Sequence, residues 1–203
     1  MAVENEYKFT SDRADADECL SALRTFIDNS GIPYSISFKS YTDTYYDSNG
    51  MGITSDGCFI RKRIYSNGKC KLTVKKPISV NGPMSREEIE KVTDGSFGSL
   101  QEFCDECFFS IVLDPVPKLT NVCERTVFSL DDGSGIKLSF DKCQYADVDR
   151  RKEYLEIELE VLSDAVVTDF DRIGLVDFVI NSLNFTRVYE SKYVRGLRWK
   201  KEN

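Results

Sequence analysis

The sequence predicts an α+β fold in which an antiparallel sheet of about eight strands is accompanied by a few helices. Segments rich in β-branched and aromatic residues outnumber helical ones, and most of them are joined by short turns. The chain has 203 residues, of which 41% are hydrophobic, enough for one cored domain or at most two small ones. An antiparallel set of about eight strands is also the size that closes into a barrel.

The first half of the chain is predicted to hold five strands and one helix. Residues 3–9 alternate in polarity, which predicts a strand. Apolar residues at helical spacing from Ala16 to Ile27 predict a helix, with Ser11 or Asp12 as its N-cap and Gly31 at its end. The other strands are expected at 34–48, 57–66, 67–77 and 84–93, with a turn at 47–52.

The second half begins with a predicted helix at 99–112 and a connector at 113–119, because two prolines disfavour a regular element there. Three strands are expected at 121–131, 135–147 and 151–161. An amphipathic helix follows at 163–183, and a short final helix is expected to begin near Ser191.

Composition excludes several classes of function. The formal net charge is −7, which argues against general binding of nucleic acid or anionic membranes. We find neither a signal peptide nor a stretch of ~18 apolar residues, and therefore expect a cytoplasmic protein. The chain has no His, so a Ser-His-Asp triad, a Cys-His nucleophile and imidazole metal ligands are excluded.

The 7 Cys residues are expected to be reduced thiols. Cys104 and Cys107 form a single CxxC pair without a second pair or a His. A metal or redox role is the alternative, but buried positions on a helix explain the pair better.

Charged residues recur at alternate positions, so they share one face of each predicted strand. The pattern includes Glu4, Glu6 and Lys8; Arg61 and Arg63; Lys71, Thr73 and Lys75; Arg86, Glu88 and Glu90; and Glu156, Glu158 and Glu160. A solvated sheet face is the simple explanation for any one strand. Neighbouring glutamates without interleaved opposite charge repel one another, however, and such a set suits a hard divalent cation.

The basic strands supply the complementary chemistry. Arg offers a planar fork to phosphate, and Lys offers a point charge. The sequence contains neither GxxxxGK[ST] nor GxGxxG, so side chains rather than a glycine loop must bind any phosphate. Carboxylates and basic residues on one sheet face predict binding of a metal-polyphosphate substrate.

These residues resemble the CYTH superfamily, the triphosphate tunnel metalloenzymes. The segment ENEYK, Glu4 to Lys8, matches the ExExK signature of that family. The segments YYDS, FIRKRI, KLTVKKP, REEIE, CERTVFSL, LSFD, EYLEIELE and SKY follow in the family's order. The resemblance extends from Glu4 to about Arg198 and implies one domain over residues 1–203. It implies an eight-stranded antiparallel tunnel with a charged lumen and helices outside.

The resemblance also implies roles for individual residues, with Mg²⁺ or Mn²⁺ as cofactor. The expected metal ligands are Glu4, Glu6, Glu156, Glu158 and Asp141. The expected triphosphate-binding residues are Lys8, Arg61, Arg63, Lys75, Arg125 and Lys192. Lys8, Asp141, Arg61 and Arg63 are the candidate catalytic residues, with Asp141 also able to order the attacking water. Further candidates are Glu88, Glu90, Lys71 and Arg86, with Glu160 at the rim. Arg195 and Arg198 are expected at the surface.

Three functions fit this reading. The first is metal-dependent hydrolysis of a triphosphate, with inorganic tripolyphosphate preferred over thiamine or nucleoside triphosphates. The second is a class IV-type adenylate cyclase that converts ATP to cyclic AMP and pyrophosphate. The third is a non-catalytic polyphosphate or nucleotide sensor. The expected partner is the small-molecule triphosphate alone, with no nucleic acid or membrane, bound by a monomer or homodimer.

Overall fold

The computed structural model describes residues 2–77, 84–107, 115–131, 136–146, 152–161 and 173–202. For residues 2–5, 77, 84–86, 97, 161 and 202 within these ranges, the backbone is described without the side chain. In these ranges no helix is long and apolar enough to span a membrane.

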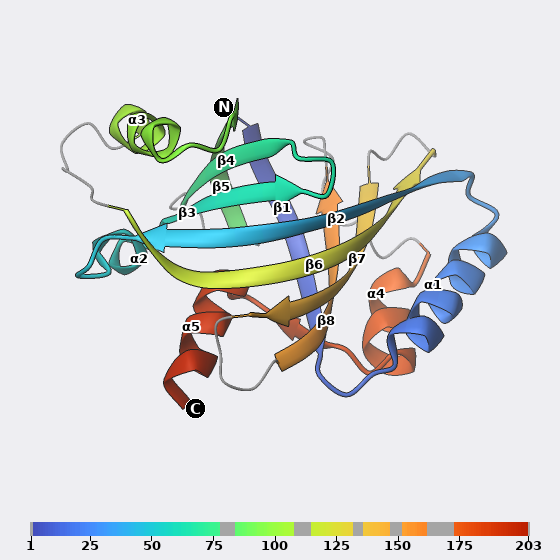
Figure 1. Cartoon of the computed structure of the whole chain (residues 1–203). Helices are drawn as coiled ribbons and strands as arrows, with labels where there is room; N and C mark the ends of the chain where they lie inside the picture. The colour runs from blue at the N-terminus through green and yellow to red at the C-terminus, as the bar shows by residue number, and fades with distance from the viewer. Residues whose placement is uncertain are drawn as a thin grey trace.

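The centre of the molecule is an antiparallel β-sheet that closes on itself (Figure 1). Its strands are β1 (Ala2–Ser11), β2 (Tyr34–Asp47), β3 (Phe59–Tyr65), β4 (Cys70–Pro77), β5 (Met84–Thr93), β6 (Val116–Leu130), β7 (Ile136–Tyr145), β8 (Lys152–Val161) and β9 (Thr186–Val188). Their order is β5-β4-β3-β2-β6-β7-β8-β1-β9, and β5 also pairs with β1. The first eight strands therefore form the predicted closed barrel, and β9 is added beside β1.

Strand β1 is the seam of this barrel. One of its edges pairs with β8 over Asn5–Ser11. The other edge is shared, because β5 pairs with Ala2–Glu6 and β9 pairs with Lys8–Thr10.

Helices cover the outside of the barrel and enter its interior. They are α1 (Ala16–Ser30), α2 (Gly52–Ser55), α3 (Phe97–Cys107), α4 (Leu175–Asp177), which continues as a π-helical turn at Phe178–Ser182, and α5 (Lys192–Glu202). Helices α1 and α4 lie side by side on one flank, where Phe26 stacks on Phe178 at 4.3 Å (Figure 1). Helix α3 lies near β4 and packs Leu100 and Phe103 against Leu72 and Val74.

The outer and inner faces of the strands follow the predicted alternation. On β8, Leu155, Ile157 and Leu159 join the core beneath α1 and α4. Glu156 and Glu158 take the opposite face and point into the lumen, where Lys192 meets both of them. The charged face of the sheet is therefore its inside.

Helix α5 fits within one end of the barrel because Gly196 lets it approach the wall closely. A Cβ atom at this position would lie 2.8 Å from Tyr145 Cε1 and would also collide with Leu119. The preceding turn contributes Tyr193, which is fully buried and stacks on Tyr45 at 5.0 Å. This helix therefore closes the apolar half of the lumen and carries Lys192 and Arg195 inside.

The structure corrects several local predictions. Helix α1 is capped by Asp15, whose carboxylate accepts the amides of Asp17 and Glu18, and not by Ser11 or Asp12. Residues 116–119 belong to β6 rather than to a connector; the pairing shifts register between Tyr45 and Tyr46, and a bulge of this kind accommodates Pro117.

Two short elements of the structure were not predicted from the sequence. Two predicted helices run into residues that the structure does not describe. Helix α2 begins at Gly52, the last residue of the expected turn. Strand β9 lies between the two helices expected near the end of the sequence. Residues 108–112 and 163–172 of the predicted helices lie outside the described residues.

Candidate functional site

The charged half of the lumen holds a cavity of about 290 Å³, which we call the front chamber. Its lining residues are Glu6, Lys8, Lys39, Tyr45, Phe59, Arg61, Arg63, Tyr65, Lys71, Lys75, Glu88, Glu90, Arg125, Lys137, Glu158, Glu160, Ser191 and Lys192. Nine of these side chains are cationic and five are acidic. The chamber is thus positive inside a chain whose net charge is −7, which favours an anionic ligand.

Strands β2 and β3 place an arginine pair at the wall of the chamber. Arg63 donates from Nε to Asp43 Oδ1 at 2.6 Å and from Nη2 to Oδ2 at 2.7 Å, and its guanidinium lies 3.6 Å from the Tyr41 ring centroid. Arg61 lies 3.8 Å from the same carboxylate and donates to Thr73 Oγ1 at 3.2 Å. Asp43 therefore fixes Arg63 and helps to position Arg61.

Strands β6, β7 and β8 place a second arginine beside two carboxylates. Arg125 and Asp141 are directly opposite in the β6–β7 ladder. Arg125 donates from Nε and Nη2 to the two oxygens of Asp141, both at 2.6 Å, and Nη2 also donates to Glu158. Asp141 has no exposed surface, so it lies behind Arg125 rather than on the chamber surface.

Lys192 from α5 reaches the same carboxylates. Its Nζ lies 2.9 Å from Asp141 Oδ2 and 2.7 Å from Glu158 Oε1, and it also donates to Glu156. The other oxygen of Glu156 accepts from Arg195 Nη2. Asp141, Glu156 and Glu158 thus each have a cationic partner, which offsets the cost of burying their charge.

The three carboxylates could also hold a divalent cation. Asp141, Glu156 and Glu158 each offer an oxygen, and these atoms lie within 4.8 Å of one another. An all-oxygen donor set suits Mg²⁺ or Mn²⁺. These residues therefore fit the expected metal, provided that Lys192 or Arg125 moves aside.

Strands β1, β4 and β5 carry further ion pairs of the chamber. Lys8 Nζ lies 2.6 Å from Glu6 Oε1. Lys75 lies 3.6 Å from Glu88, and Lys71 pairs with Glu90.

The charges shift the pKa of several chamber groups. Burial raises the pKa of Glu158, but Arg125, Lys192 and Lys8 outweigh this and hold it well below its usual range. Burial lowers the pKa of Lys192, and its carboxylate partners raise it well above the ordinary value. Both groups are therefore ionised at neutral pH.

Most residues singled out in the sequence meet in this lumen. Lys8, Arg61, Arg63, Lys75, Arg125 and Lys192 line the chamber together with Glu6, Glu158, Glu88, Glu90, Lys71 and Glu160. Asp141 and Glu156 lie directly behind them, with no exposed surface. The side chains of Glu4 and Arg86 lie outside the described part of the structure.

Arg195 corrects one prediction and Asp43 adds a residue that was missed. Arg195 is 9% exposed and pairs with Glu156, so it is not a surface charge. Arg198 is exposed, as expected.

Asp43 stands on the lumen face of β2. Its place at alternate positions with Tyr41 and Tyr45 was the sequence signal that could have identified it. Lys39 and Lys137 are further lining residues that were not singled out.

Comparison with known proteins places this geometry in a family. The model of the CYTH domain matches residues 3–175. The structure of PH1819 from Pyrococcus horikoshii OT3 is similar with a TM-score of 0.62 at 19% identity, covering 98% of this chain and 99% of that one. A comparison with curated protein sequences finds no significant match.

Two further similar structures carry functional names. HpAC1 from Hippeastrum, proposed as an adenylyl cyclase and found to have a dominant triphosphatase activity, gives a TM-score of 0.59 at 18% identity, covering 98% of this chain and 96% of that one. The mimivirus capping enzyme triphosphatase gives 0.52 at 14% identity, covering 89% of each chain. These similarities confirm the fold, and the match of the family model over residues 3–175 shows that the chain belongs to the CYTH domain family.

Proposed function

We propose that this protein hydrolyses a triphosphate in the front chamber with the help of Mg²⁺ or Mn²⁺. The observation that carries the proposal is the convergence of Arg61, Arg63, Arg125, Lys75 and Lys192 on one cavity. A polyanion with several phosphates can satisfy such a set, whereas a single carboxylate or a neutral ligand cannot. The triphosphatase activity named for HpAC1 and for the mimivirus enzyme supports the same class of substrate.

Inorganic tripolyphosphate is the preferred substrate in this proposal. The cavity of about 290 Å³ is small, and 14 of its 18 lining residues are charged. Among the described residues, the aromatic lining is Tyr45, Phe59 and Tyr65, of which Tyr45 and Phe59 are already packed around Tyr193. A chamber of this kind suits bare phosphate groups better than a nucleoside.

The carboxylates supply the cation site in the proposal. Glu158 faces the chamber, and Asp141 and Glu156 lie behind it. Glu6 stands on the neighbouring strand β1 beside Lys8, whose Nζ lies 3.9 Å from Glu158 Oε1. A divalent cation held there would offset the charge that develops on the phosphate oxygens. Lys192 exchanges its carboxylate partners for phosphate oxygens as the substrate enters.

The proposed reaction is in-line attack of water on the terminal phosphorus. The water oxygen bonds to phosphorus while the bridging P–O bond breaks, and its electron pair leaves with the diphosphate. Arg61, Arg63 and Arg125 offset the charge on the transferred phosphoryl oxygens. Glu158 accepts a hydrogen bond from the water and orients it, and the released proton passes to solvent. Asp141 acts through Arg125 as a positioning residue.

A phosphate-release assay tests the proposal. Purified protein is incubated with tripolyphosphate and Mg²⁺ or Mn²⁺, and matched samples contain EDTA. We expect metal-dependent release of one orthophosphate per tripolyphosphate. The variant Arg125→Gln should lower the rate by ~10²–10³-fold, because it removes one charged contact to the transition state. The matched control Lys142→Gln removes an exposed cation outside the chamber and should leave the rate unchanged.

The same assay separates the two alternative functions. With ATP, a cyclase yields cyclic AMP and pyrophosphate, whereas a triphosphatase yields ADP and orthophosphate. A sensor binds tripolyphosphate without metal-dependent turnover, and its Glu6→Gln variant binds as the native protein does. Either result would replace the proposal of hydrolysis.

A further inference from the structure

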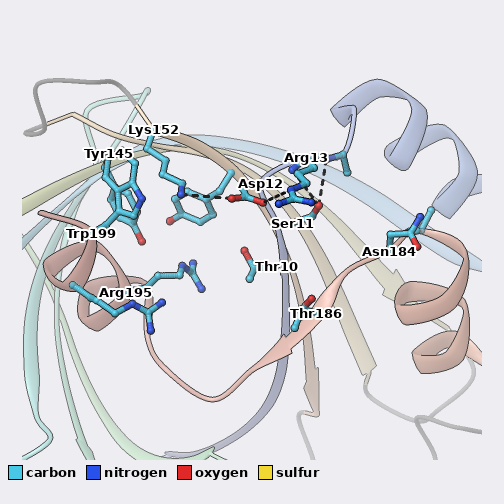
Figure 2. Close-up of a pocket in the computed structure, with 14 residues that line it drawn as sticks. Thr10, Ser11, Asp12, Arg13, Tyr145, Lys152, Asn184, Thr186, Arg195 and Trp199 are labelled. Carbon is cyan, nitrogen blue, oxygen red and sulfur yellow. Dashed lines mark hydrogen bonds and ion pairs between the residues drawn. The ribbon is translucent and has the colours of Figure 1, made fainter. Parts of the chain in front are cut away.

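The lumen continues beyond the front chamber, on the other side of Lys192 and Arg195. Thr10 follows Lys8 by two residues on β1, and Tyr154 precedes Glu156 by two residues on β8, so both lie on the lumen face. They line a cavity of about 650 Å³ that we call the rear chamber (Figure 2). Its other walls are the turn at residues 11–14, the segment from Leu183 to Thr186, and α5.

The rear chamber is also cationic. Arg13, Lys152, Arg195 and Arg198 line it, and Asp12 is its one acidic lining residue within the described part of the chain. The negative charge of Asp12 is partly offset by Lys152, whose Nζ lies 3.6 Å from Asp12 Oδ2 (Figure 2). An excess of positive charge in a cavity of an acidic protein attracts anions.

Arg195 at the floor of this chamber has unused hydrogen-bonding capacity. Its Nη2 donates to Glu156, and its guanidinium carbon lies 4.6 Å from the Tyr154 ring centroid. Among the described residues, neither Nε nor Nη1 has a hydrogen-bond partner, although both atoms are buried. Buried donors are normally satisfied by protein, water or ligand, so these two N–H groups indicate a missing acceptor.

Two further cations stand on the walls near Arg195. Arg198 and Trp199 are one turn further along α5, on the same side as Arg195. Lys152 Nζ lies 4.6 Å from the Trp199 ring centroid, and Arg198 is held at 2.8 Å by Glu190, which does not line the chamber. Both side chains reach the chamber from its rim and can turn toward a ligand without leaving a buried charge unpaired.

We propose that the rear chamber is a second oxyanion site, which binds orthophosphate. Two guanidinium forks and an ammonium group match the several acceptor oxygens of a phosphate ion, and Thr10 and Thr186 add hydroxyl groups to the lining. Arg195 links this site to the front chamber, since Glu156 accepts from Arg195 on one oxygen and from Lys192 on the other. The site goes beyond the proposed function, because it requires neither metal nor turnover. Its phosphate can come from solution or from hydrolysis in the front chamber.

The fluorescence of Trp199 is a selective probe, because this residue lines the rear chamber and is the single Trp of the sequence. Its fluorescence is titrated with sodium phosphate in EDTA, with ionic strength held constant by sodium chloride. We expect a saturable change with phosphate and none with chloride alone. Arg198→Gln and Lys152→Gln should each weaken phosphate binding by ~10-fold, as expected for loss of one charge-assisted hydrogen bond. Lys201→Gln is the matched control, because it removes an exposed cation from the same helix outside the chamber.

Three outcomes would overturn the site: no saturable change in the native protein, equal weakening by all three variants, or unchanged binding in both chamber variants. Circular dichroism establishes that each variant is folded. Since this titration contains no triphosphate, it can succeed where the hydrolysis assay fails, and the reverse.

A second experiment, in which the Trp199 fluorescence is followed during turnover, identifies the source of phosphate. If the Trp199 signal during hydrolysis exceeds that given by the same bulk phosphate, the ion comes through the lumen; if the signals are equal, it comes from solution. Both results support the site.

Discussion

Asp43 and Arg63 form a two-point ion pair inside the barrel, with Nε–Oδ1 and Nη2–Oδ2 distances of 2.6 and 2.7 Å. The carboxylate has no exposed surface, and the guanidinium lines the front chamber. Since Arg63 is also stacked on Tyr41, its orientation is fixed before any ligand arrives. Asp43 therefore positions Arg63, which we propose to bind phosphate, and its substitution gives a first prediction.

We expect Asp43→Asn to impair both stability and substrate handling. Removing one partner of a buried ion pair costs ~3–5 kcal/mol of unfolding free energy, because the other charge stays buried. Urea unfolding measures this loss, and tripolyphosphate kinetics should show a lower kcat/KM. The control Asp56→Asn changes an exposed carboxylate and should alter neither. A variant with native stability would contradict the role assigned to this pair.

The pH dependence of stability should carry the signature of the same residue. Burial raises the pKa of Asp43, but Arg63 and Arg61 outweigh it, so the folded pKa is below the ordinary value. A carboxylate with a lowered folded pKa stabilises the fold above its unfolded pKa of about 3.9, and this contribution disappears as pH falls through the folded pKa.

The stability difference between the native protein and Asp43→Asn should therefore be constant from neutral pH to about pH 5 and shrink below about pH 4. Unfolding in urea at stepped pH measures it. A difference that grew on acidification would show that Asp43 is not held ionised by its arginine partners.

Lys192 gives a prediction about metal binding. Its ammonium group meets Asp141, Glu156 and Glu158, and Lys192→Met leaves these carboxylates with less compensating charge. We expect a lower melting temperature without metal and a larger rise with MnCl₂ than in the native protein, by about 5 °C or more. Thermal unfolding with and without MnCl₂ measures both values.

The matched control for Lys192 is Lys200→Met, which removes an exposed cation of the same helix. It should respond to MnCl₂ as the native protein does. If Lys192→Met gained no additional response, the three carboxylates would not be the cation site.

Gly196→Ala should loosen the internal helix. Alanine at an ordinary helical position is more stable than glycine by ~1 kcal/mol, whereas overpacking a core costs ~1–3 kcal/mol. Because the added Cβ would lie 2.8 Å from Tyr145 Cε1, we expect net destabilisation in urea and weaker tripolyphosphate binding as Lys192 shifts. Gly50→Ala, with no atom within 4 Å of its Cβ, is the control. A stabilised Gly196→Ala would contradict the close fit of α5.

The sequence predicted the barrel and its charged interior because both depend on strand periodicity. Glu156 and Glu158 alternate with Leu155 and Ile157, so a single strand already separates lumen from outer core. Lys71 and Lys75 follow the same rule. That the charged faces of separate strands meet in one lumen could be predicted only if the sheet was assumed to close, since an open sheet would show the same alternation.

The remaining features depend on packing between distant segments. Arg195 has the local sequence of an exposed helix charge, and only insertion of α5 into the barrel brings it to Glu156. Asp43 has uncharged residues two positions away on either side, Tyr41 and Tyr45, so the search for charges at alternate positions did not mark it. Pro117 lies within β6 because the neighbouring register shift lets a residue without a backbone N–H fit into the pairing of β6 with β2. Such contacts are properties of the tertiary structure rather than of local periodicity.

The seam at β1 has a consequence for how the protein is made. Strand β1 pairs with β8, whose residues are translated about 150 positions later, as in the pairing of Ser11 with Leu155. Contacts so distant in sequence slow folding and leave strand edges open in the meantime. Lys192 and Arg195 are translated later still, so Glu156 and Glu158 have no ammonium or guanidinium partner from α5 until that helix has been made. A nascent chain therefore holds an unfinished ring until β8 and α5 have both emerged from the ribosome.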